Sequence, residues 1–206
     1  MAPHDMTIDT GIATLALPGE IESGDLSLVK HVGPGVLVAV VDGLGHGEEA
    51  AAAAHAATGA IGKYAKESLP DILRRCQTAV NGTRGVVLSL AYFDPVGKAV
   101  TWLGVGNVCG VLLRGDRAAR PAHVWLLPVA GFVGSRAGEP EHLHIDARME
   151  SLARGDTVIF ATDGIATRFA DAAMPKLAPQ ALADHILARH ATGKDDALVL
   201  VTRFVG

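Results

Sequence analysis

The sequence is poor in the residues that mark several classes of protein. Only 4% of its residues are aromatic and its formal net charge is −4 at pH 7, so neither a base-stacking surface nor a basic face for nucleic acid or acidic membrane is expected. It has two cysteines, Cys76 and Cys109. Neither belongs to a CxxC pair or to a zinc-type spacing with histidine, so we expect two buried, reduced thiols and no structural zinc site.

Long hydrophobic runs are also missing. No apolar stretch reaches the ~18 uninterrupted residues of a membrane span, and the first ten residues lack the basic start and apolar run of a signal peptide. We therefore expect a cytoplasmic protein. With 206 residues, of which 49% are hydrophobic and 19% charged, the chain suits one globular domain over residues 1–206 with a sizeable core.

Changes in hydrophobic periodicity predict the order of strands and helices. The expected strands cover residues 10–17, 25–31, 36–41, 86–93, 99–105, 108–114, 123–127, 156–162 and 197–204. Helices are expected over 48–66, where alanine dominates, over 70–80, which begins with proline, and over 179–190. Strands in blocks joined by hairpins, with helices in separate blocks, favour an α+β fold with antiparallel sheets over a doubly wound parallel sheet.

Acidic residues and glycine stand at the ends of three aliphatic segments: 38–43 (VAVVDG), 158–164 (VIFATDG) and 193–201 (GKDDALVLV). A strand end fixes a carboxylate at the rim of a sheet, and a neighbouring glycine lets the backbone turn and present a carbonyl oxygen. Oxygen ligands without histidine or cysteine favour Mg²⁺ or Mn²⁺. Because an isolated Asp-Gly pair is usually a simple turn, the residues alone predict no more than a divalent-cation site.

These segments, taken together, resemble a known enzyme family. Residues 42–47 (DGLGHG), 161–164 (ATDG) and 193–196 (GKDD) are similar to motifs of the PPM (type 2C) metal-dependent protein phosphatases, in the bacterial branch of the stage II sporulation protein E type. Residues 23–25 (SGD) match an early element of that branch, and 104–107 (GVGN) match a later Ala-Gly-His-Asn segment more loosely. The motifs occur in the family's order across nearly the whole chain.

The resemblance implies a four-layer αββα sandwich, two antiparallel sheets flanked by helices, with two Mn²⁺ or Mg²⁺ ions at one edge. By position, Asp42 would bridge both ions and Gly43 would offer its carbonyl oxygen to one of them. Asp163 and Asp195 would complete the protein ligands of the other, and Asp25 would bind the second metal directly or through water. Two such ions can hold and deprotonate a bridging water for attack on phosphorus, without a covalent phosphoenzyme.

Further residues of the motifs are expected to support this centre. Asp196 and Asn107 would orient ligands, and His46 is interpreted as a loop residue that makes a stabilising hydrogen bond. Leu198 stands where many relatives have threonine. No residue could be assigned to the phosphate-binding arginine that eukaryotic relatives carry near their N-terminus.

Three other features have plainer interpretations. His55 lies in the alanine-rich helix and is expected to be structural or at the surface. Lys194 precedes the acidic pair and is interpreted as a solvated lysine, with phosphate contact as the alternative. The glycine-containing loop 131–134 is interpreted either as part of the substrate entrance or as a plain surface loop.

The resemblance implies a phosphoserine/phosphothreonine phosphatase with phosphorylated regulatory proteins as partners. Because 206 residues leave no room for an added sensor domain, the chain is similar to a free-standing phosphatase of this branch that acts on stressosome scaffold proteins in a sigma-factor partner-switching cascade. Two alternatives remain. The chain could be a non-catalytic adaptor that binds phosphoproteins with the same fold, or a hydrolase of small phosphate esters.

Overall fold

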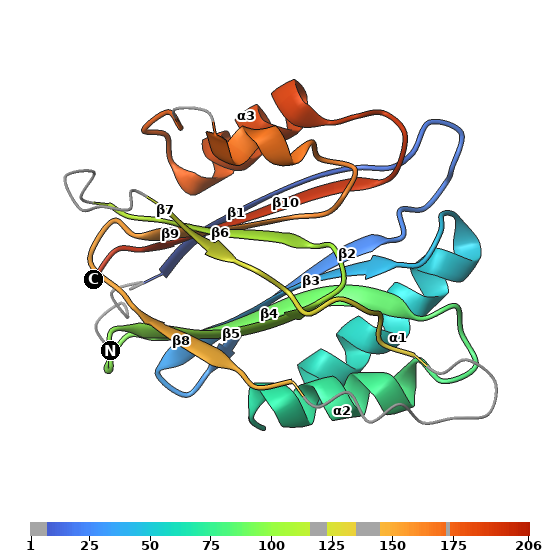
Figure 1. Ribbon diagram of the computed structural model, residues 1–206, viewed down its shortest axis with the longest axis horizontal. Coiled ribbons are helices and arrows are strands. Elements are labelled where there is room, and N and C mark those ends of the chain that lie inside the picture. Colours follow the sequence, from blue (N-terminus) through green and yellow to red (C-terminus); the bar gives the residue numbers. More distant parts are fainter. Residues whose placement is uncertain (1–7, 116–122, 135–144, 172–173) are drawn as a thin grey trace, which may run out of the picture.

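The structure is a computed structural model that describes residues 8–115, 123–134, 145–171 and 174–206. Residues 1–7, which make up most of the N-terminal segment that was compared with a signal peptide, lie outside the described ranges. Two sheets, each of five antiparallel strands, pack face to face (Figure 1). Sheet 1 has the order β1 (Ile8–Leu15), β10 (Ala197–Phe204), β9 (Thr157–Ala161), β6 (Cys109–Leu113) and β7 (His123–Leu126). Sheet 2 has the order β2 (Asp25–Val32), β3 (Gly35–Gly43), β4 (Val86–Asp94), β5 (Ala99–Val105) and β8 (Arg148–Ser151).

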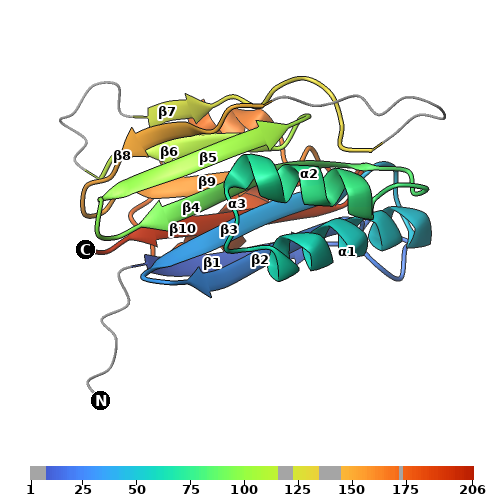
Figure 2. The same cartoon turned by 90° about the horizontal axis from the view of Figure 1, so that it is seen from below.

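Helices cover the two outer faces of this sandwich. Helix α1 (Glu48–Lys63) and helix α2 (Leu69–Ala79) lie on sheet 2, as the view from below shows (Figure 2). Helix α3 (Pro179–His190) and the short 3-10 helix η1 (Thr167–Asp171) lie on sheet 1. The predicted α+β class and the four-layer αββα arrangement are therefore confirmed.

The aliphatic run of β3 shows why the sequence makes this sandwich. Val36, Val38 and Val40 point into the core between the two sheets, whereas Leu37 and Ala39 point into the core beneath α1 and α2. Successive side chains of a strand point to opposite faces. A strand that is buried on both faces must therefore be apolar at every position, which explains the absence of alternation.

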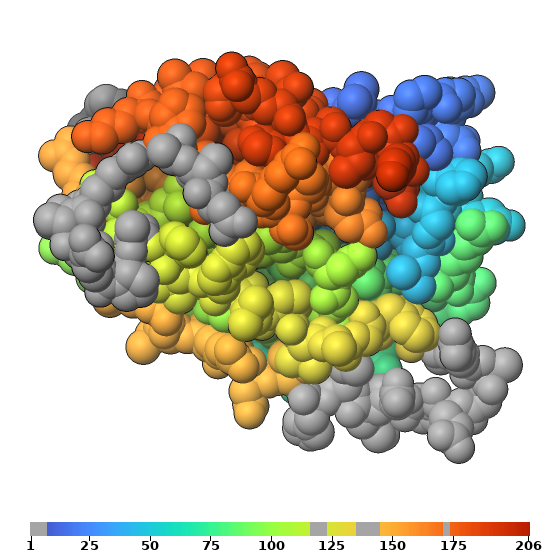
Figure 3. All heavy atoms as spheres, turned by 45° about the horizontal axis from the view of Figure 1, so that its top comes forward, coloured from blue at the N-terminus to red at the C-terminus, as the bar shows by residue number. Residues whose placement is uncertain are grey.

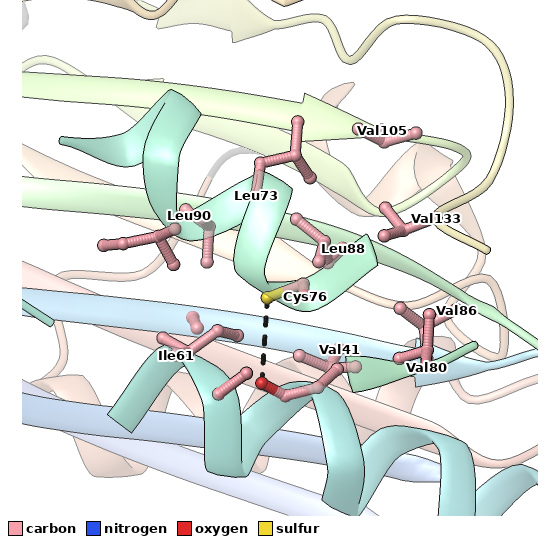
Figure 4. Close-up of a cluster of buried hydrophobic side chains, with 14 of the residues drawn as sticks. Val41, Ile61, Leu73, Cys76, Val80, Val86, Leu88, Leu90, Val105 and Val133 are labelled. Carbon is pink, nitrogen blue, oxygen red and sulfur yellow. Dashed lines mark hydrogen bonds between the residues drawn. The ribbon is translucent and has the colours of Figure 1, made fainter. Parts of the chain in front are cut away.

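The core beneath α1 and α2 contains one of the two cysteines. Figure 4 shows Cys76 pointing from α2 toward α1, where its thiol donates a hydrogen bond of 3.7 Å to the carbonyl oxygen of Ala57. Burial raises the pKa of this thiol to about 12. Cys109 is also a free thiol, but it is half-buried at the start of β6 rather than buried as expected.

Several boundaries and two elements differ from the sequence prediction. The first strand covers Ile8–Leu15 rather than 10–17, and α1 ends at Lys63 rather than at residue 66. Strand β8 and helix η1 were not predicted. The side chains of β8 are mostly exposed because it is the edge strand of sheet 2, so it carries no clear apolar alternation. Among the described residues, no helix combines the length and apolar character that crossing a bilayer requires.

Two glycines allow chain segments to meet closely at one edge of the sandwich. A Cβ atom on Gly43 would lie 2.1 Å from the carbonyl oxygen of Ala50 in the first turn of α1. A Cβ atom on Gly164 would lie 1.9 Å from the carbonyl oxygen of Asp196. Any larger residue would force these segments apart, so the glycine that follows each of Asp42 and Asp163 is needed for packing at the acidic edge.

Candidate metal and active site

The predicted acidic residues come from both sheets and meet at one edge. Asp25 at the start of β2 pairs in register with Asp42 near the end of β3. Asp163 follows the end of β9, and Asp195 directly precedes β10 together with Asp196. Strand pairing joins β9 to β10 within sheet 1. The two sheets therefore bring residues up to 171 positions apart to the same rim.

A cavity of about 480 Å³ opens at this edge, and Asp42, Asp163 and Asp195 line it. The other lining residues are mostly small or apolar: Leu44, Gly45, Val87, Gly106, Asn107, Ala130, Gly131 and Phe132. In the space-filling view, the yellow residues 123–134 run along one face of the molecule toward the segments around the start of α1 (Figure 3). The loop 131–134 thus contributes Gly131 and Phe132 to the cavity wall.

The carboxyl groups at this edge perturb each other's ionisation. Burial and the neighbouring carboxylates raise the pKa of Asp42 to about 8 and that of Asp25 to about 7. Burial and Asp195 also raise the pKa of Asp163. Each of these shifts reflects negative charge brought together in a partly desolvated place, which a bound cation would relieve.

Thr162 ties the two sheets together at the site. Its hydroxyl donates a 2.7 Å hydrogen bond to Oδ2 of Asp25 in sheet 2 and accepts a 2.9 Å bond from the backbone N–H of Leu198 in β10. Both Thr162 and Asp25 are buried. The hydrogen bond lowers the pKa of Asp25 and so opposes the effect of burial. Thr162 therefore fixes the Asp25 carboxylate and favours its charged form.

Asp196 holds the segment that precedes β2. Only 3% of its surface is exposed, and its two carboxylate oxygens accept 2.7 Å hydrogen bonds from the backbone N–H groups of Leu17 and Gly24. The carbonyl oxygen of Gly24 in turn accepts a 3.0 Å bond from the N–H of Gly43. Asp196 is thus linked through the backbone of Gly24 to Gly43, the residue that follows Asp42.

The remaining residues named from the sequence differ in their relation to this centre. Asn107 donates a 2.8 Å hydrogen bond to Oδ2 of Asp163. His46 is exposed, does not line the cavity, and contacts Oε1 of Glu20 through Nδ1 at 2.6 Å. His55 is exposed on α1 and contacts Glu22 at 3.0 Å. Lys194 is exposed beside the acidic pair.

The donor set fits hard divalent cations that retain water. It consists of carboxylate oxygens, with the carbonyl oxygen of Gly43 beside them, and such ligands suit Mg²⁺ and Mn²⁺. Within the described part of the chain, no three His, Cys, Asp or Glu side chains form a ready-made metal cage. Mg²⁺ in proteins commonly keeps several water ligands beside one or two carboxylates.

Some residues of the site were not identified from the sequence. Thr162 was noted only as part of the ATDG motif and Leu44 only as part of the DGLGHG motif. Phe132 belongs to the loop 131–134, for which a place at the substrate entrance was one of two interpretations. Ser23 accepts a 3.1 Å hydrogen bond from the N–H of Asp25 and so helps to shape the start of β2. One signal in the sequence pointed to a role of Thr162: it is a hydroxyl residue that directly precedes Asp163, a predicted metal ligand.

The two hydrogen bonds of the Thr162 hydroxyl lead to a testable prediction for metal binding. We expect Thr162→Val to raise the Mn²⁺ concentration for half-saturation by about 10- to 100-fold, the usual cost of losing a residue that orients a metal ligand. It also leaves the buried N–H of Leu198 without its partner, which costs about 1–3 kcal/mol of stability. Thr162→Ser keeps the hydroxyl and is the matched control. Calorimetric titration that gives equal Mn²⁺ affinity for the two variants would contradict this role.

The fold and the acidic edge define a class of protein. Residues 33–205 match the family described as stage II sporulation protein E (SpoIIE), and the chain belongs to this family, which has the fold of the metal-dependent PP2C-type phosphatases. The resemblance seen in the sequence motifs is thereby confirmed. A structure of the PP2C phosphatase domain of SpoIIE from Bacillus subtilis matches with a TM-score of 0.78 at 22% identity, over 96% of this chain and 64% of that one.

Particular relatives are similar over most of their length. Phosphoserine phosphatase RsbX of Bacillus subtilis (strain 168) is 27% identical over 158 residues, which are 77% of this chain and 75% of RsbX. The structure of RsbX in complex with magnesium matches with a TM-score of 0.83 at 24% identity, over 98% of this chain and 97% of that one. A third match is a structure for the bacterial stressosome, a modular system that has been adapted to control secondary messenger signalling. Its TM-score is 0.82 at 30% identity, over 95% of this chain and 99% of that one.

Proposed function

We propose that this protein is a single-domain, metal-dependent phosphatase that hydrolyses phosphoserine or phosphothreonine on regulatory partner proteins. One observation carries the proposal: Asp42, Asp163 and Asp195, which are far apart in sequence, line one cavity in a chain of the SpoIIE family. The relationship to phosphoserine phosphatase RsbX supports a phosphoprotein substrate. The match to a stressosome protein supports scaffold proteins of a stressosome-type partner-switching cascade as the substrates.

In this proposal two Mn²⁺ or Mg²⁺ ions would be bound by the carboxylates of Asp42, Asp163 and Asp195. The carbonyl oxygen of Gly43 and the carboxylate of Asp25 would be further ligands. When bound, such ions supply the activated water and the charge stabilisation that phosphoryl transfer needs. The protein's own contribution is to fix the ligands. Asn107 fixes Asp163 through its 2.8 Å hydrogen bond.

Nucleophilic catalysis by cysteine does not fit the structure. Neither Cys76 nor Cys109 lines the cavity, and burial raises the pKa of the two thiols to about 12 and about 11. A thiol is nucleophilic as its thiolate, which is scarce at neutral pH for such groups. Water is therefore the nucleophile that the site supports best.

A phosphatase assay separates this function from its two alternatives. We expect the protein with Mn²⁺ to release phosphate from a phosphorylated stressosome scaffold protein, and to lose this activity when the metal is chelated. A hydrolase of small esters would cleave p-nitrophenyl phosphate but spare every phosphoprotein. An adaptor would bind the phosphoprotein without releasing phosphate. Release of phosphate that is unaffected by chelation would contradict the metal-dependent mechanism.

A further inference from the structure

The candidate site carries more negative charge than two divalent cations neutralise. Five aspartates lie at this edge: Asp25, Asp42, Asp163, Asp195 and Asp196. A phosphate monoester arrives with nearly two further negative charges at neutral pH. A cationic side chain at the rim would therefore favour substrate binding by direct attraction. Cationic side chains stand beside two of the residues that line the cavity, since Arg84 lies against Gly45 and Lys194 precedes Asp195.

The guanidinium group of Arg84 lies on the DGLGHG loop. A Cβ atom on Gly45 would lie 2.6 Å from Nη1 of Arg84, so the absence of a side chain at Gly45 makes room for the arginine. Gly45 also lines the cavity that contains Asp42. Arg84 thus lies against a backbone segment that lines the acidic cavity.

The backbone on either side of Arg84 is held in place. The Thr83 hydroxyl donates to the carbonyl oxygen of Val80 at 2.7 Å and accepts from the N–H of Gly85 at 3.1 Å. The carbonyl oxygen of Gly85 accepts a 3.0 Å bond from the N–H of Leu44, and a Cβ atom on Gly85 would lie 3.0 Å from the ring of Phe132. The Arg84 backbone is therefore fixed between two cavity-lining segments.

The side chain of Arg84, in contrast, is held by an exposed ion pair with Glu49. It forms an ion pair of 2.5 Å with Glu49, and the two side chains are 49% and 68% exposed. Exposed ion pairs contribute little to stability because water screens them. Exchange of Glu49 for a phosphate group would cost little, and the planar guanidinium can donate two parallel hydrogen bonds to phosphate oxygens.

We propose that Arg84 is a substrate-binding residue that receives the phosphate group of the phosphoserine or phosphothreonine, releasing Glu49 as it does so. This inference rests on the proposed phosphatase function. It assigns phosphate recognition to the loop between α2 and β4, which the sequence motifs left without a candidate. Lys194 is the competing residue, but it offers a point charge on a flexible stem without the paired donors of arginine.

The test compares Arg84→Ala and Arg84→Lys with Arg74→Ala, an exposed arginine of α2 that pairs with Asp71. The Mn²⁺-loaded enzymes are assayed on a phosphoserine peptide and on p-nitrophenyl phosphate, with inorganic phosphate as competitive inhibitor. We expect Arg84→Ala to raise the Ki of phosphate and the KM of both substrates by about tenfold, with Arg84→Lys in between and Arg74→Ala unchanged. An unchanged phosphate Ki in Arg84→Ala, or a loss that appears in Lys194→Ala instead, would overturn the assignment.

Glu49→Gln separates substrate binding from a structural role of the ion pair. It breaks the pair but leaves Arg84 free, so we expect phosphate to bind as tightly as in the wild type or more tightly. If the pair were only structural, Glu49→Gln and Arg84→Ala would show the same loss. If wild-type protein cleaves no phosphate ester, the proposed function fails. The assignment is then decided by whether phosphate with Mn²⁺ raises the Tm of wild type more than that of Arg84→Ala.

Discussion

Replacing Asp42 or Asp163 with asparagine is expected to lower kcat/KM for a phosphoprotein by at least about 1,000-fold. Each change keeps the shape of the side chain but removes the negative charge that would hold a divalent cation in the cavity lined by both residues. Losing a residue that only orients a metal ligand costs about 10- to 100-fold, so losing a ligand itself should cost more. Steady-state phosphate release at saturating Mn²⁺ measures this effect.

The matched control for these variants is Asp184→Asn, which changes an exposed aspartate of α3 whose carboxylate accepts a hydrogen bond from Gln180. It should leave kcat/KM within about twofold of the wild type, since substitutions away from packed or functional groups usually have small effects. Retention of wild-type activity by both Asp42→Asn and Asp163→Asn would show that the acidic edge is not the catalytic centre.

The second large effect concerns the stability of the metal-free protein, which is expected to fall as the pH rises from 6 to 9. Folding raises the pKa of Asp25 to about 7 and of Asp42 to about 8, from an ordinary 3.8. A raised folded-state pKa means that the folded protein binds more protons than the unfolded chain. The stabilising contribution is complete below about pH 4 and is lost progressively as the pH rises through 7 and 8.

The loss between pH 6 and pH 9 is on the order of 2–4 kcal/mol, since one pKa unit corresponds to about 1.4 kcal/mol and the two groups are coupled. For a chain of this length that lowers the Tm by roughly 5–15 °C. Saturating Mn²⁺ should remove most of the fall because the cation stabilises the charged carboxylates. Asp42→Asn should show a shallower pH dependence without metal. A wild-type Tm that stays constant or rises over this range would refute the account of these carboxyl groups.

The elements that could be predicted from the sequence are those whose burial shows in the local pattern of residues. The aliphatic runs before Asp42 and Asp163 predicted buried strands, and β3 and β9 are almost entirely buried. Because each run ends in an aspartate and a glycine, the position of both carboxylates at the rim could also be predicted. The motifs and their order indicated the family, which the match over residues 33–205 confirms.

Contacts between distant segments could not be predicted in the same way. The bond from Thr162 to Asp25 joins residues 137 positions apart, and the bond from Gly24 to Asp196 joins residues 172 positions apart. Nothing in the local pattern of either residue specifies its partner. Arg84 illustrates the same limit, since its place against Gly45 arises only when the α2–β4 loop packs on the DGLGHG loop.

In the proposed function, the carboxylates at this edge bind two divalent cations. Crystals grown with Mn²⁺ and measured for anomalous scattering test it most directly. We predict two anomalous peaks about 3.5–4 Å apart, the usual spacing of two-metal sites, with Asp42 between them and Asp163 and Asp195 beside one of them. A map without peaks at saturating Mn²⁺, or with peaks only away from Asp42, would show that these carboxylates do not form a two-metal site.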